Sequence, residues 1–156
     1  MPLYTPKEQL LADLENVFSG EPWYGESVLT ILEGISSEQA MKPVGGRRIY
    51  TLLLHMLAWR GYLLRQLQGE TDFDIEVNSV VDWPPYQKEG PEAWPRAIAS
   101  LQENQRQLLA LLRSLSEEQL MDTVPRRHFS FAFLINGLIQ HDVYHLGQMA
   151  LLQKLA

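Results

Sequence analysis

The hydrophobic residues of this chain recur at the three- and four-residue spacing of amphipathic helices over most of its length. No stretch alternates convincingly with the period of two that half-buried strands show, so the pattern predicts an all-α fold without significant sheet. The predicted helices run from Thr5 to a break at Gly20 and Pro22, through a second piece at 28–35, over about 48–68, from 91–95 to about 112, and over about 129–155.

Local signals mark where these helices begin and end. Thr5 can cap the first helix, Pro6 suits its first position, and Glu8 completes a capping box. Gly69 is a suitable stop for the helix over 48–68. Residues 70–91 then form a long connection that contains several prolines and therefore carries no helix of its own.

An internal repeat relates the two halves of the chain. Residues 36–41 (SSEQAM) resemble residues 116–121 (SEEQLM), and residues 47–51 (RRIYT) resemble residues 126–130 (RRHFS). Each half then consists of a helix, a short capped turn, a loop and another helix. If a two-fold axis relates the halves, the helices over 48–68 and 129–155 are antiparallel.

Three of the four histidines indicate a metal site. His141 and His145 lie four residues apart in a predicted helix, so their imidazoles share one face and can hold one divalent ion. His55 lies on the apolar face of the helix over 48–68. A parallel arrangement would place His55 about 10 Å from the level of His141, whereas an antiparallel one brings it opposite the pair. The site therefore favours an up-down-down-up four-helix bundle with one long crossover between the second and third helices.

The metal interpretation competes with a simpler one. A lone histidine on an apolar helix face is usually a core residue with a satisfied hydrogen bond, and this holds for His55 by itself. Burying the His141–His145 pair without a metal, however, leaves several polar nitrogens in need of partners. Three imidazoles also leave a metal one open position, as in catalytic sites. His128 lies more than three turns from His141 and is expected at the surface.

Three further polar residues are candidates for orienting a ligand or substrate. Gln148, one turn beyond His145, can orient a ligating imidazole or simply lie on the helix surface. Tyr144 can donate to a substrate anion or be a core tyrosine. Gln105 interrupts the apolar face of the third predicted helix, either as a tolerated edge position or as a polar group that points at a site inside the bundle.

Other motifs give weaker evidence about the function. The string from His141 to His145 is similar to the His-Glu-x-x-His helix of zinc peptidases, but Asp142 replaces the glutamate and no third ligand follows. Asp142 points about 100° away from His141 around the helix and is expected to cap or pair elsewhere. The double arginines at 47–48 and 126–127 are expected at opposite ends of the bundle, as solvated loop residues.

Composition narrows the classes of function. A chain of 156 residues is long enough for one domain, and a net charge of −6 argues against nucleic-acid binding. Without cysteine there is no disulfide, thiolate ligand or cysteine nucleophile. No apolar segment reaches the roughly 20 residues that a membrane span needs. We expect a soluble cytoplasmic protein that acts on a small molecule.

Three blocks of the sequence resemble the DinB-like superfamily of metal-binding helical bundles: residues 22–25 (PWYG), 54–59 (LHMLAW) and 137–148 (GLIQHDVYHLGQ). The resemblance covers nearly the whole chain. It implies an up-down-down-up bundle, a divalent metal, usually zinc or nickel, on His55, His141 and His145, and a homodimer. Some similar proteins are transferases that use a small thiol such as bacillithiol or mycothiol, but most have no assigned reaction.

Two functions remain open from the sequence. The first is a metal-dependent enzyme, a transferase or hydrolase in which the metal activates water or a low-molecular-weight thiol. The second is a non-catalytic, metal-stabilised helical module for binding or stress response. A polar cavity beside the histidines would favour the enzyme, whereas burial under Trp59, Tyr62 and Leu138 would favour the module.

Overall fold

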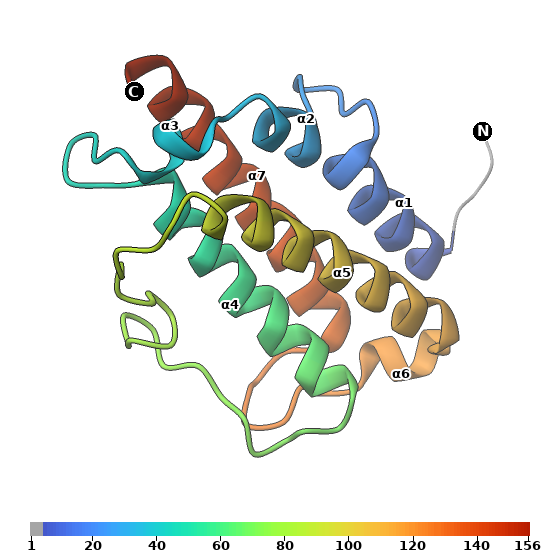
Figure 1. Cartoon of the computed structure of the whole chain (residues 1–156). Helices are drawn as coiled ribbons and strands as arrows, with labels where there is room; N and C mark the ends of the chain where they lie inside the picture. Colours follow the sequence, from blue (N-terminus) through green and yellow to red (C-terminus); the bar gives the residue numbers. More distant parts are fainter. Residues whose placement is uncertain (1–4) are drawn as a thin grey trace.

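The computed structural model describes residues 5–156, which form helices joined by loops (Figure 1). Within this range the secondary structure besides helices is limited to two isolated β-bridges, so the all-α prediction is confirmed. The helices are α1 (Pro6–Ser19), α2 (Val28–Glu33), α3 (Ser37–Met41), α4 (Ile49–Leu67), α5 (Ala93–Ser114), α6 (Glu117–Met121) and α7 (Phe131–Leu155). No described helix is both long enough and apolar enough to cross a lipid bilayer.

The long helices pack side by side around one main core. Helix α4 contacts α5 and α7, and α1 contacts the same two helices from the other side. In Figure 1, α4 and α5 run in one direction, α1 and α7 run in the other, and the connection between α4 and α5 passes along the outside. The core is made of fully buried side chains from all four helices, among them Leu14, Leu53, Met56, Leu101, Leu108 and Met149.

The two segments that the repeat pairs have the same local structure. Short helices α3 and α6 both begin with a capping box, in which Ser36 and Gln39 or Ser116 and Gln119 satisfy each other's backbone N–H groups. The predicted capping box of Thr5 and Glu8 is also present at the start of α1. Local capping chemistry therefore sets these helix starts as the sequence indicated.

Both double-arginine segments fasten the connection between α4 and α5 to the bundle. Arg127 donates to the hydroxyl of Tyr62 (3.1 Å) and pairs with Asp74 of the connection. The guanidinium of Arg48 lies 4.0 Å from the ring centroid of Tyr86, also in the connection. The prediction that these arginines are merely solvated loop residues is therefore wrong for Arg48 and Arg127. Ion pairing and stacking hold the connection where it can cover the histidines.

Candidate metal centre

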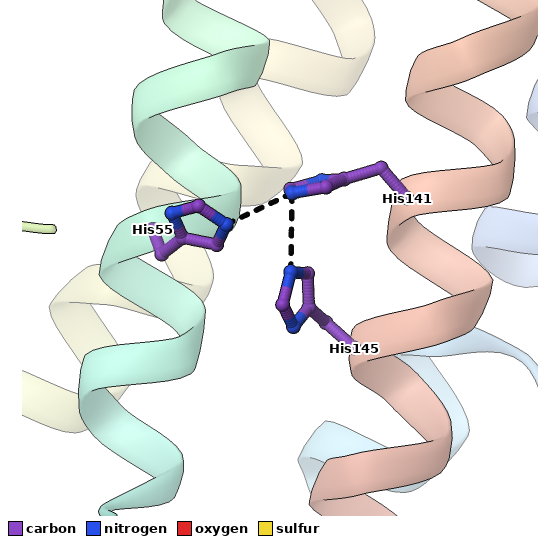
Figure 2. A group of neighbouring side chains, drawn as sticks. All are labelled: His55, His141 and His145. Atoms are coloured by element: carbon purple, nitrogen blue, oxygen red, sulfur yellow. Dashed lines mark hydrogen bonds between the residues drawn. The ribbon is translucent and has the colours of Figure 1, made fainter. Parts of the chain in front are cut away.

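Three imidazoles from two antiparallel helices converge at mid-bundle (Figure 2). Helix α4 supplies His55, and α7 supplies His141 and His145 one turn apart. The Nε2 atom of His141 lies 2.9 Å from Nε2 of His55 and 3.1 Å from Nε2 of His145. Each histidine offers one nitrogen to a group whose members all lie within 4.8 Å of one another. The structure thus brings together the three residues that the sequence paired with a metal.

In two of the rings, the hydrogen bond at Nδ1 determines whether Nε2, which faces the other histidines, carries a proton. Nδ1 of His55 lies 2.7 Å from the backbone oxygen of Asp82, and Nδ1 of His145 lies 2.8 Å from Oε1 of Gln148. Because both partners are acceptors, we assign the proton of each ring to Nδ1, which leaves a lone pair on Nε2. Nε2 of His141 can then donate to only one of its two neighbours. The lone pair on the other neighbouring Nε2 is then left without a hydrogen, and a cation shared by the three rings would satisfy all three Nε2 atoms.

Burial keeps the rings of His141 and His145 neutral. Desolvation, reinforced by the other two histidines, lowers the pKa of His141 from 6.5 to about 3. Desolvation also lowers the pKa of His145, although its hydrogen bond with Gln148 opposes the shift. Neutral imidazole is the form that binds metals, so both rings are in the ligand state at neutral pH.

Two neighbouring residues of the long connection complete the site, and sequence reasoning missed their role. Asp82 is 2% exposed, and its carboxylate oxygen Oδ1 lies 3.0 Å from Nδ1 of His55 and accepts a 2.7 Å hydrogen bond from Nε1 of Trp59. The indole of Trp83 stacks on the His55 ring, with centroids 3.8 Å apart and planes 4° apart. A carboxylate behind a metal-binding histidine is a common arrangement that fixes the ring and its tautomer.

Two of the three predicted orienting residues lie at the site. Gln148 accepts the Nδ1–H bond of His145, which fits the prediction that it orients a ligating imidazole. Tyr144 is 65% exposed, so its interpretation as a core tyrosine is wrong. Its ring contacts the edge of His145 at a centroid distance of 5.0 Å, and it faces the same cavity as that histidine.

Gln105 lies elsewhere, in a fully buried polar network. Arg60 and Asp142 have no solvent exposure and pair at 2.6 Å. Arg60 also donates to Oε1 of Gln105 (2.9 Å), and the amide of Gln105 donates to the backbone oxygen of Leu14 (3.1 Å). The prediction that Gln105 orients a substrate or a metal ligand is therefore wrong, because its hydrogen-bonding groups serve Arg60 and α1. Asp142 pairs away from the site, as the sequence indicated.

Two cavities reach the histidines from opposite ends. One, of about 320 Å³, is lined by His145, Gln148 and Tyr144 together with Arg47, Leu52, Trp83, Leu151 and Leu152. The other, of about 220 Å³, is lined by His141 and by apolar groups including Trp59, Phe129 and Leu138. The cluster is thus shielded by aromatic rings without being closed, and a small molecule can approach it.

Comparison with known proteins adds one finding. A family model described as the DinB superfamily matches residues 25–149, a range that contains all three histidines, Asp82 and Gln148. No curated protein and no solved structure matches the chain.

Proposed function

The chain belongs to the DinB superfamily, and from this premise we propose that it is a metal-dependent enzyme with His55, His141 and His145 as metal ligands. The reaction is of the transferase or hydrolase type and activates water or a low-molecular-weight thiol. One observation carries the proposal: three histidines each offer a nitrogen to a group within 4.8 Å, beside a cavity large enough for a small molecule. The metal is zinc or nickel, as the family implies, since imidazole suits both.

The spacing of the rings fits a first-row metal ion. Nitrogens that bind a tetrahedral ion at 2.0–2.1 Å lie about 3.3 Å from one another. The two Nε2 pairs that involve His141 are 2.9 and 3.1 Å apart, and the offered nitrogens of all three rings lie within 4.8 Å of one another, which is close to that geometry. The hydrogen bonds at Nδ1 of His55 and His145 hold the lone pairs of those two rings toward this point. Three protein ligands leave further positions for a substrate atom.

The protein's own residues then define the chemistry. A divalent cation held here supplies Lewis acidity, which lowers the pKa of a water or thiol that reaches it. Asp82 and Gln148 fix two rings, and Trp83 shields His55 from water. Tyr144 and Gln148 offer hydrogen bonds to a substrate in the larger cavity. The chain contains no cysteine, so a thiol, if used, comes from a second molecule. The described residues that line the two cavities include no Asp or Glu, so no carboxylate of these walls serves as base.

The exposed cavities favour an enzyme over a metal-stabilised module, and a single variant separates the two. We expect wild-type protein to contain one divalent ion per chain by elemental analysis and His145→Ala to lose it while keeping its helical circular dichroism and most of its melting temperature. Substitution of the exposed His128 by Ala is the matched control and keeps the ion. Collapse of the fold in His145→Ala would support the non-catalytic module instead.

The remaining parts of the proposal concern architecture and partners. We propose that α1, α4, α5 and α7 form an up-down-down-up bundle, supported by their directions in Figure 1 and by their pairwise contacts. We further propose that the chain is one DinB-like domain over residues 1–156 that acts on a small molecule as a homodimer. A cytoplasmic location, and the expectation of neither nucleic-acid nor membrane partners, stay predictions.

A further inference from the structure

We infer that the cavity beside His145 binds a small organic anion and that Arg47 is the residue that holds its charged group. The inference rests on the proposed metal site and names the class of substrate for it. It draws on the charge of the cavity wall, the bonding state of Arg47, and the way the fold positions this side chain.

Polar, apolar and charged residues line different parts of the cavity wall. His145, Gln148 and Tyr144 lie on the α7 side, and leucines of α4 and α7 form an apolar surface. Arg47 supplies the one formal charge among the described lining residues. In a chain with a net charge of −6, a single cation beside a metal-binding cluster favours negatively charged ligands at that place.

The guanidinium of Arg47 has no hydrogen-bond or ion-pair partner among residues 5–156. Of the nine arginines in the chain, seven form ion pairs with carboxylates. An eighth, Arg48, donates from Nε to the backbone oxygen of Met41 (3.0 Å). For Arg47 the hydrogen bonds within the described residues involve the backbone alone. Its planar set of donors, which matches carboxylate and phosphate oxygens, is therefore available to a ligand.

The backbone places this side chain at the cavity. Val44 and Arg47 pair across a two-residue turn, with N–O distances of 2.8 and 3.0 Å. Gly45 and Gly46 both adopt positive φ, 56° and 77°, which glycine takes without strain and which such a tight turn requires. The guanidinium carbon lies 4.9 Å from the ring centroid of Trp83, the same indole that stacks on His55. The turn and the indole together hold the charge at the wall of the cavity that His145 also lines.

The charged, apolar and metal-binding parts of the cavity together predict one kind of ligand. Its charged oxygens pair with Arg47, its short apolar body packs against Trp83 and the leucines, and a donor atom at its other end reaches the metal. A volume of about 320 Å³ is at the lower end for small-molecule pockets, which favours a compact molecule. A carboxylate and a phosphate share the required chemistry.

The test uses the full chain loaded with Co²⁺, whose absorption spectrum reports binding of sulfur. Mercaptopropionate and mercaptohexanoate place a carboxylate at two distances from the thiol, and the corresponding amides are neutral controls. Mercaptoethyl phosphate, compared with mercaptoethanol, tests a phosphate. We expect wild-type protein to bind at least one anionic probe about tenfold more tightly than its neutral counterpart, and the better anion identifies the charged group.

Variants assign the preference to one residue. Arg47→Gln should lose the preference for the anion while cobalt content and melting temperature stay unchanged, and Arg47→Lys should retain part of it. Arg126→Gln, which alters the counterpart of Arg47 in the repeat, should keep the wild-type preference. Equal binding of charged and neutral probes by cobalt-loaded wild-type protein would overturn the inference alone, as would an unchanged preference in Arg47→Gln. Failure of wild-type protein to bind cobalt would overturn the proposed function itself.

Discussion

Asp82 binds the ring of His55 through both its main chain and its side chain: the backbone oxygen lies 2.7 Å from Nδ1 and the carboxylate Oδ1 lies 3.0 Å from it. A residue 27 positions away in sequence therefore fixes the tautomer of one proposed ligand. The other carboxylate oxygen accepts a bond from the backbone N–H of Asn78 (2.7 Å). Through Asp82, the long connection becomes part of the candidate metal site.

Removing this carboxylate should weaken metal binding without unfolding the protein. We expect Asp82→Ala to lower the affinity for Zn²⁺ by about tenfold or more, because the ring of His55 loses a carboxylate that holds its orientation and tautomer. Competition with a chromophoric chelator measures the change. Asp72→Ala removes an exposed carboxylate of the same connection and serves as the control. Equal affinities in the two variants would contradict the role given to Asp82.

The buried network around Arg60 should be essential for stability. Arg60→Met leaves the carboxylate of Asp142 buried without its cation, so we expect the free energy of unfolding to fall by about 3–5 kcal/mol. Urea denaturation measures it. The double variant Arg60→Met, Asp142→Leu removes both charges and should recover much of the loss. If the single variant is as stable as wild type, the pair does not carry the energetic weight that its burial implies.

The metal-free protein should lose stability in acid for a defined reason. The pKa of His141 is about 3 in the folded chain and near 6.5 when unfolded, so below pH 6.5 the unfolded state binds the additional proton. The contribution of His141 to the free energy of unfolding is thus present above pH 6.5 and declines as the pH falls toward 3.

His141→Gln tests this dependence, because it removes the titrating group and leaves a polar side chain. Melting temperatures of chelator-treated protein between pH 7 and 4 should fall less steeply for the variant than for wild type. Identical slopes would show that His141 is not held neutral by burial.

Sequence reasoning succeeded where the determining interactions are local. Helical spacing places His141 and His145 on one face wherever the helix lies, and capping boxes such as that of Thr5 are set within four residues. The antiparallel pairing of two predicted helices was enough to bring His55 to the same point. The first two follow from periodicity and local capping, whereas the antiparallel pairing was inferred from the internal repeat and the placement of His55.

The residues that were missed or misplaced depend on contacts between distant segments. Asp82 and Trp83 lie in a connection without periodicity, so nothing in the pattern indicated that it folds back onto His55. Gln105 was recognised as a polar residue on an apolar helix face, but its partner is Arg60, 45 residues away. A signal for that partner existed: Arg60 lies between Met56 and Leu63 on the buried face of α4, where a charge requires a counter-charge.

X-ray absorption at the metal edge of the zinc- or nickel-loaded chain tests the central claim most directly. We predict a spectrum of three imidazole nitrogens at about 2.0–2.1 Å with at least one further light-atom donor, and the loss of one imidazole in His55→Ala. A spectrum without imidazole scattering, or one that is unchanged in His55→Ala, would contradict a shared site built from α4 and α7.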